Sequence, residues 1–246
     1  MIIGTIALLS MLFGSEQYFL LDKIEKSVKK MEIEKERKNE LLTDLKDSEK
    51  FIKEFYKLRK GKFKELRGMY ASRNTSETEF ESFFNMRSAE RADFQQTAIS
   101  RRIQVADKFT QEEWDKIIEL SAENVLAVQE KAGKKKVKDP ISSIVNTINK
   151  TISEEAKASK AISVLKDFEL QLNALAEQIS SMNALDDNVI NKKNSTFEEI
   201  EERANAGNVL RKKLFQEISI FHFEMKTLTT QKEWDKIMKE FNTLLE

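Results

Sequence analysis

The sequence predicts an all-α protein, an elongated antiparallel helical bundle made of two tandem copies of a three-to-four-helix unit. Two features of the composition indicate helices. The 246 residues include only one proline and six glycines, so the residues that interrupt helices are scarce. Charged residues make up 34% of the chain and are interspersed at short spacing, as on the solvated faces of long helices. An internal repeat indicates the two copies.

Residues 21–120 are repeated at 141–240 with a constant offset of 120 positions. The clearest match aligns residues 110–117 (TQEEWDKI) with residues 230–237 (TQKEWDKI). The same offset relates Leu45-Lys46-Asp47 to Leu165-Lys166-Asp167, Asn74 to Asn194, Glu79 to Glu199, Asn85 to Asn205 and Gln96 to Gln216. A long repeat without insertions predicts that one structural unit occurs twice.

We therefore divide the chain into a helical repeat at 22–132, a linker at 133–140 and a second helical repeat at 141–246. The linker begins at Gly133, ends at Pro140 and contains a run of lysines, a composition typical of a solvated connection. Basic and acidic residues number 42 each, so the bulk charge favours neither nucleic acid nor an acidic partner.

Residues 1–21 are interpreted as a signal peptide or a membrane anchor. Residues 2–13 carry no charge, and extending this run to Leu21, interrupted by Glu16, reaches the length of an anchor of about 20 residues. This interpretation predicts a periplasmic protein, with tethering to the inner membrane as a variant. A cytoplasmic protein stays open, because no basic residue precedes the run whereas Lys23 and Lys26 follow it.

Capping signals define helix starts at matching positions in the two copies. Each copy has two boxes in which a hydroxyl residue is followed three positions later by glutamate: Ser76 and Glu79, Thr110 and Glu113, Thr196 and Glu199, and Thr230 and Glu233. In such a box the hydroxyl accepts from the third helical N–H while the glutamate reaches back to the cap N–H. We expect the turns before the last helices at 107–109 and 227–229.

Long helices with narrow apolar faces are predicted upstream of these caps. Apolar residues spaced by 4, 3, 4 and 3 positions occur at Phe168, Leu172, Leu175, Ile179 and Met182, and again at Leu214, Ile218, Phe221, Met225 and Leu228. The first copy has Phe51, Phe55, Leu58, Leu66 and Met69. This spacing is typical of helices that pack on helices. Gly61 and Gly68 interrupt the first long helix and mark candidate bends.

Residues with catalytic or metal-binding chemistry are scarce. The chain has no cysteine and one histidine, His222, which we interpret as a satisfied, partly buried side chain. No phosphate-binding loop, dinucleotide fingerprint or nucleophile elbow occurs, so we expect no enzymatic activity and no cofactor. Trp114 and Trp234 are either exposed anchors for a partner or, as we favour, side chains that close each hairpin against the preceding long helix.

The stretch that ends each copy resembles the C-terminal half of the Spy/CpxP family of periplasmic helical proteins. That family carries Leu-Thr-x-x-Gln motifs, and here residues 109–113 (FTQEE) fit with phenylalanine for leucine and glutamate for glutamine. In the second copy, residues 229–233 (TTQKE) depart further. The motif residues, which we interpret as structural, are Thr110, Gln111, Glu113, Trp114, Thr230, Gln231, Glu233 and Trp234. The resemblance implies a cradle-shaped antiparallel dimer, here made within one chain.

The first functional hypothesis is a non-catalytic envelope binding protein, a chaperone or stress-response protein that contacts unfolded clients or a protein partner. The alternative is a structural scaffold subunit of a membrane-associated assembly, with contact to the membrane through residues 1–21. No nucleic acid and no small-molecule substrate is indicated. A concentrated apolar patch would favour the chaperone, whereas apolar stripes along the long helices would favour the scaffold.

Overall fold

The computed structural model describes residues 19–121, 140–186 and 189–244. Its helices are α2 (Leu21–Lys30), α3 (Lys35–Asp44), α4 (Lys46–Ala71), α5 (Glu77–Ala106), a helical segment at 111–121, α7 (Pro140–Thr151), α8 (Glu155–Asp186), α9 (Phe197–Leu228) and α10 (Gln231–Leu244). Every regular element within these ranges is a helix, which confirms the all-α prediction.

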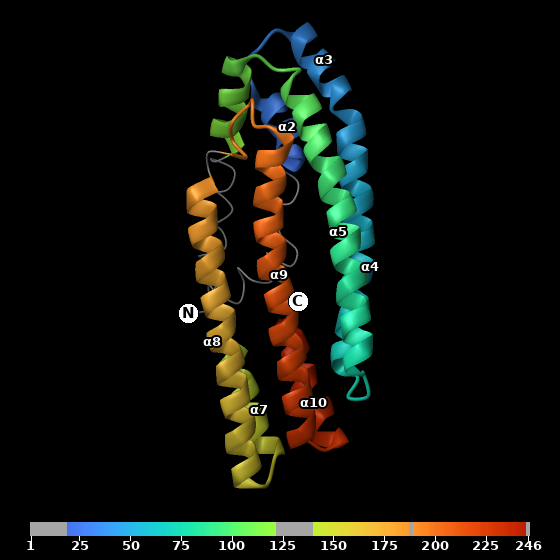
Figure 1. Cartoon of the computed structure of the whole chain (residues 1–246), viewed down its shortest axis with the longest axis vertical. Helices are drawn as coiled ribbons and strands as arrows, with labels where there is room; N and C mark the ends of the chain where they lie inside the picture. Colours follow the sequence, from blue (N-terminus) through green and yellow to red (C-terminus); the bar gives the residue numbers. More distant parts are fainter. Residues whose placement is uncertain (1–18, 122–139, 187–188, 245–246) are drawn as a thin grey trace.

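Four long helices, α4, α5, α8 and α9, run along the length of an elongated molecule (Figure 1). Helix α9 packs against both α5 and α8, and α5 runs antiparallel to α9 (Figure 1). The short helices gather at the two ends: α3 and the segment at 111–121 at one end, and α7 and α10 at the other (Figure 1). Helix α10 contacts α4 as well as α7, so packing crosses between the two predicted repeats.

The structure confirms the helix starts that the capping signals predict at Ser76 and Thr196. The Ser76 and Thr196 hydroxyls accept from the backbone N–H groups of Glu79 and Glu199, each at 3.2 Å, and both glutamates reach back to the cap N–H. The turn after α5 begins at Asp107 as expected. The second turn is predicted to begin at residue 227, which is too early. Helix α9 continues through Leu228, and the chain becomes extended only at Thr229.

Four of the five residues predicted for each apolar face of α8 and α9 are buried, while Leu228 is partly buried and the side chain of Met182 lies outside what the structure describes. Phe168, Leu172, Leu175 and Ile179 are buried, as are Leu214, Ile218, Phe221 and Met225. The face predicted for α4 is wrong at Leu58, which is 46% exposed. The buried residues of α4 are Ser48, Ile52, Phe55, Arg59, Leu66 and Tyr70, so the helix is rotated to bury Ile52 and Arg59 instead.

Gly61 and Gly68 lie inside α4, which continues through both as one helix. A methyl group added at either position meets no atom within 4 Å. We expect Gly61→Ala and Gly68→Ala each to raise the free energy of unfolding by about 0.5–1 kcal/mol, since alanine loses less backbone entropy in a helix. Urea denaturation checks this; a lower unfolding free energy in both variants would contradict the assignment of open helix positions.

Two clusters of buried apolar side chains form the interior. The C-terminal core combines residues between 141 and 241 with Leu66, Tyr70, Phe80, Phe83 and Phe84 from α4 and α5. The N-terminal core combines residues between 19 and 120 with Ile200 and Ala204 of α9, and Val189, Ile190 and Phe197 pack against it. The tip of each long hairpin therefore enters the core built mainly from the other half of the chain.

The N-terminal boundary of the folded part lies earlier than predicted. Phe19 and Leu21, the last residues of the segment predicted as a signal peptide or membrane anchor, are 2% and 4% exposed and belong to the N-terminal core. Residues 1–18 lie outside the described ranges, as do linker residues 133–139, whereas Pro140 is already the first residue of α7. None of the described helices combines the length and the apolar character needed to cross a membrane.

Candidate functional site

The two tryptophans of the repeated motif are fully buried and hydrogen-bond across the molecule. The Trp114 indole Nε1–H donates to the backbone oxygen of Asn191 at 2.7 Å, and that of Trp234 donates to the oxygen of Ala71 at 2.8 Å. Asn191 follows Ala71 by 120 positions, as Trp234 follows Trp114. Each indole thus binds the loop at the tip of the opposite hairpin. We call these contacts the Trp114 junction and the Trp234 junction.

The capping residues of the motif position each tryptophan. Thr110 and Thr230 accept from the backbone N–H groups of Glu113 and Glu233 at 3.1 and 3.4 Å, and the glutamates accept from the threonine N–H groups at 2.8 and 2.7 Å. The hydrogen bond from the Thr230 backbone lowers the pKa of Glu233. Because the cap fixes the first turn, Trp114 and Trp234 point inward one turn later.

The glutamines of the motif take no part in the junctions. Gln111 and Gln231 are exposed and donate from Nε2 to Asp115 and Asp235, at 2.8 and 2.7 Å. These bonds join positions one helical turn apart on the surface of the last helix of each copy.

Glu113 has a second partner that the sequence did not reveal. Arg37 of α3 donates from Nε to Oε1 and from Nη2 to Oε2 of Glu113, both at 3.0 Å, and Nη2 also reaches the oxygen of Lys108 at 2.6 Å. The Arg37 hydrogen bond is the main reason that the pKa of Glu113 lies below its ordinary value. This two-point contact ties α3 to the turn that precedes the Trp114 junction.

Arg102 completes the Trp114 junction. Its side chain is 0% exposed, and its Cζ lies 4.9 Å from the centroid of the Trp114 ring. The guanidinium donates to the oxygens of Ile190 and Lys193 at 3.1 Å and to that of Lys192. Burial lowers the pKa of Arg102 to about 10, so the group stays charged at neutral pH. The charge is held by backbone oxygens from the opposite hairpin tip.

His222 takes the place of Arg102 in the Trp234 junction, 120 positions later. Its ring lies 4.7–5.8 Å from those of Tyr70, Phe80, Phe223 and Trp234, centroid to centroid. Neither ring nitrogen has a hydrogen-bond partner within the described residues. Burial, helped by the nearby charge of Lys226, lowers the pKa of His222 to about 4. The interpretation as a satisfied, partly buried histidine is therefore wrong: the ring is buried, neutral at pH 7 and held by aromatic contacts.

Ionisable groups and exposed apolar side chains are the remaining surface features of the described ranges. No group of three or more histidine, aspartate or glutamate residues in this part of the chain is arranged to hold a metal ion. The exposed large apolar side chains are dispersed over α4, α5, α8 and α9: Tyr56, Leu58, Met86, Leu170, Val209 and Ile220. Comparison with protein-family models, curated proteins and solved structures found no match to this chain.

Proposed function

We propose that the two repeats form a fused antiparallel dimer within one chain, in which each half completes the other. The observation that carries this proposal is the reciprocal pair of indole hydrogen bonds, Trp114 to Asn191 and Trp234 to Ala71. A second matched pair supports it. The Thr75 hydroxyl donates to the oxygen of Met69 at 2.7 Å, and Ser195, 120 positions later, donates to the oxygen of Val189.

On this basis we propose a non-catalytic helical binding protein of the bacterial envelope, similar to the Spy/CpxP chaperones and stress-response proteins. A fused dimer of this kind presents long helices whose apolar side chains contact a client weakly beside solvated charges. Weak contacts of this sort allow fast release. The most exposed apolar side chains, Leu170, Val209 and Ile220, are 64%, 57% and 50% exposed and are the first candidates for such contacts.

A scaffold subunit of a larger assembly is the second candidate, and the dispersion of the exposed apolar residues favours it. A chaperone surface would concentrate apolar area in one patch, whereas here six side chains are spread over four helices. These positions do not form a continuous apolar stripe, so the support for the scaffold is only that they are not gathered in one client-binding patch.

An aggregation assay separates the two candidates. We expect the chaperone to suppress aggregation of a chemically unfolded client at near-equimolar ratio, and Leu170→Ser/Val209→Ser/Ile220→Ser to weaken the suppression at least threefold. The exposed pair Lys212→Ser/Lys213→Ser provides a control on α9. No suppression by the wild type would reject the chaperone and favour the scaffold. Digestion of the native protein in spheroplasts tests the envelope location, since a species protected inside the cell would contradict it.

A further inference from the structure

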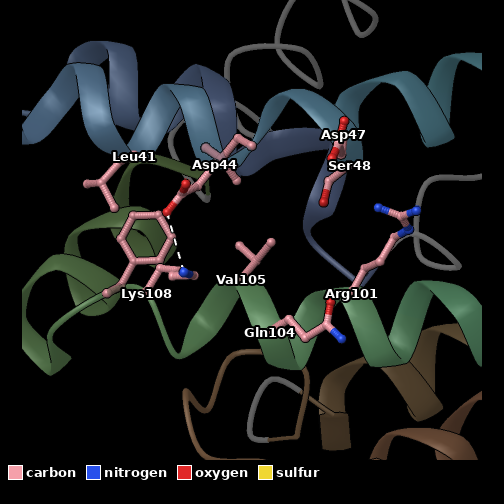
Figure 2. A pocket seen from close by; sticks show the side chains of 10 residues that line it. Leu41, Asp44, Asp47, Ser48, Arg101, Gln104, Val105 and Lys108 are labelled. Atoms are coloured by element: carbon pink, nitrogen blue, oxygen red, sulfur yellow. Dashed lines mark ion pairs between the residues drawn. The ribbon is translucent and has the colours of Figure 1, made fainter.

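A pocket of about 260 Å³ lies between the α3–α4 junction and the end of α5 (Figure 2). Its apolar lining consists of Leu41, Leu45, Val105 and Phe109, which are all buried. The volume corresponds to roughly nine water molecules at about 30 Å³ each, a size suited to a small metabolite rather than to a large cofactor.

The two walls of the pocket carry opposite charges. Figure 2 shows Asp44, Asp47 and Ser48 on the α3–α4 side, facing Arg101, Gln104 and Lys108 on the α5 side. Lys108 Nζ lies 3.7 Å from Asp44 Oδ2, so these two groups form an ion pair at one end of the pocket.

The other end of the pocket holds Arg101 and Asp47. Arg101 stacks over the Phe51 ring, with Cζ 4.9 Å from its centroid, and its buried Nε has no hydrogen-bond partner among the described residues. No ion pair joins Arg101 to Asp47 within these residues. A cationic and an anionic group therefore line a common space that the described residues leave open.

The corresponding region of the second half is filled with aromatic side chains. Adding 120 to Ser48 and Arg101 gives Phe168 and Phe221, whose rings stack with centroids 4.6 Å apart. The same offset replaces Asp44 by Val164, which is also buried in the C-terminal core. The first half thus has Asp44, Ser48 and Arg101 where the second has packed apolar residues, whereas Asp47 is matched by the exposed Asp167. Because Asp44 and Asp47 are exposed, this difference leaves solvated charges at the rim of an apolar pocket, where a polar ligand can reach them.

We propose that this pocket binds a small zwitterion with an apolar side chain, such as a free amino acid, with its carboxylate on Arg101 and its ammonium group on Asp47. Arginine matches a carboxylate through two parallel N–H donors, and Gln104 provides a further donor on the same wall. The apolar side chain of the ligand lies against Leu45 and Val105. This inference goes beyond the client-binding role proposed above and does not require it.

Calorimetric titration of the full chain at pH 7 with four probes tests the charge requirement. L-leucine is expected to bind, while N-acetyl-L-leucine lacks the cation, L-leucinamide lacks the carboxylate and glycine lacks the apolar group. We expect each of the last three to bind at least tenfold more weakly than leucine. Absence of leucine binding, or equal binding of N-acetyl-leucine, would overturn the proposal.

Variants test the location of the site. Arg101→Gln and Asp47→Asn are each expected to weaken leucine binding at least tenfold, whereas Lys57→Gln, an exposed charge of α4 outside the pocket, leaves it unchanged. Ser48→Phe introduces the residue found at the matching position of the second half and is expected to fill the pocket and abolish binding. Circular dichroism of each variant verifies folding. Wild-type affinity in a folded Ser48→Phe variant would overturn the assignment.

Discussion

Replacing Trp234 by alanine is expected to lower the free energy of unfolding by about 3–5 kcal/mol. The indole is 0% exposed and lies in the C-terminal core against His222, with ring centroids 4.7 Å apart. Truncating a buried aromatic side chain removes its burial and leaves a cavity. The change also removes the donor to the Ala71 oxygen, which ties α10 to the tip of the α4–α5 hairpin. Chemical denaturation followed by circular dichroism measures the effect.

The Trp234→Phe variant separates the hydrogen bond from the packing. Phenylalanine keeps most of the apolar contact but has no donor, so we expect a loss of about 1–2 kcal/mol, near the value of one buried hydrogen bond. Trp114→Phe serves as the matched variant, since its indole donates to Asn191 at 2.7 Å in the same manner. A loss below about 1 kcal/mol for Trp234→Ala, or no loss for both phenylalanine variants, would contradict the role assigned to the two junctions.

Acidification from pH 7 to pH 4 is expected to remove about 3 kcal/mol of stability through His222 alone. Its pKa is about 4 in the folded protein and 6.5 as the ordinary value. The unfolded chain therefore binds a proton at a pH where the folded chain does not. The contribution is present above pH 6.5, is lost as the pH falls through the range between 6.5 and 4, and levels off below the folded pKa of about 4. Urea titrations at a series of pH values measure it.

The His222→Phe variant is the control for this pH dependence. Phenylalanine suits a site surrounded by Tyr70, Phe80 and Trp234 and does not titrate. We expect the variant to have nearly constant stability between pH 6.5 and 4.5. Glu79 and Glu233 also have lowered pKa values, through hydrogen bonds from their caps, so their contributions disappear only below about pH 4.5. An unchanged pH profile in His222→Phe would show that His222 is not the responsible group.

Local features of the sequence predicted the secondary structure well. The caps at Ser76, Thr110, Thr196 and Thr230 depend on side chains within three residues of one another, so their geometry follows from sequence spacing alone. The apolar faces of α8 and α9 were likewise visible, because each repeats at regular helical spacing. In α4 the pattern was less regular, and the buried Arg59 was hidden among the charged residues that normally face solvent.

The contacts between the halves could not be predicted in the same way. Trp114 was expected to close its own hairpin, and its ring does stack with Arg102 of the preceding helix, but its N–H reaches the opposite hairpin. Sequence periodicity shows which face of a helix is apolar but not which helix covers it. Arg102 could have been identified from the sequence as the counterpart of His222, because it lies 120 positions earlier. The pocket beside Arg101 could be found only from the fold, because its two walls, residues 41–48 and 101–109, lie at least 53 positions apart in the sequence.

The most direct test of the interlocked architecture is to express residues 1–132 and 141–246 as separate chains, alone and together, and to examine them by native mass spectrometry and thermal unfolding. Each core draws on the hairpin tip of the other half, including Tyr70 and Phe80 in the C-terminal core and Ile200 in the N-terminal core. We therefore predict a one-to-one complex with cooperative unfolding when both are present, and loss of cooperative unfolding for either fragment alone. Two monomeric fragments that each unfold cooperatively and do not associate would contradict the account.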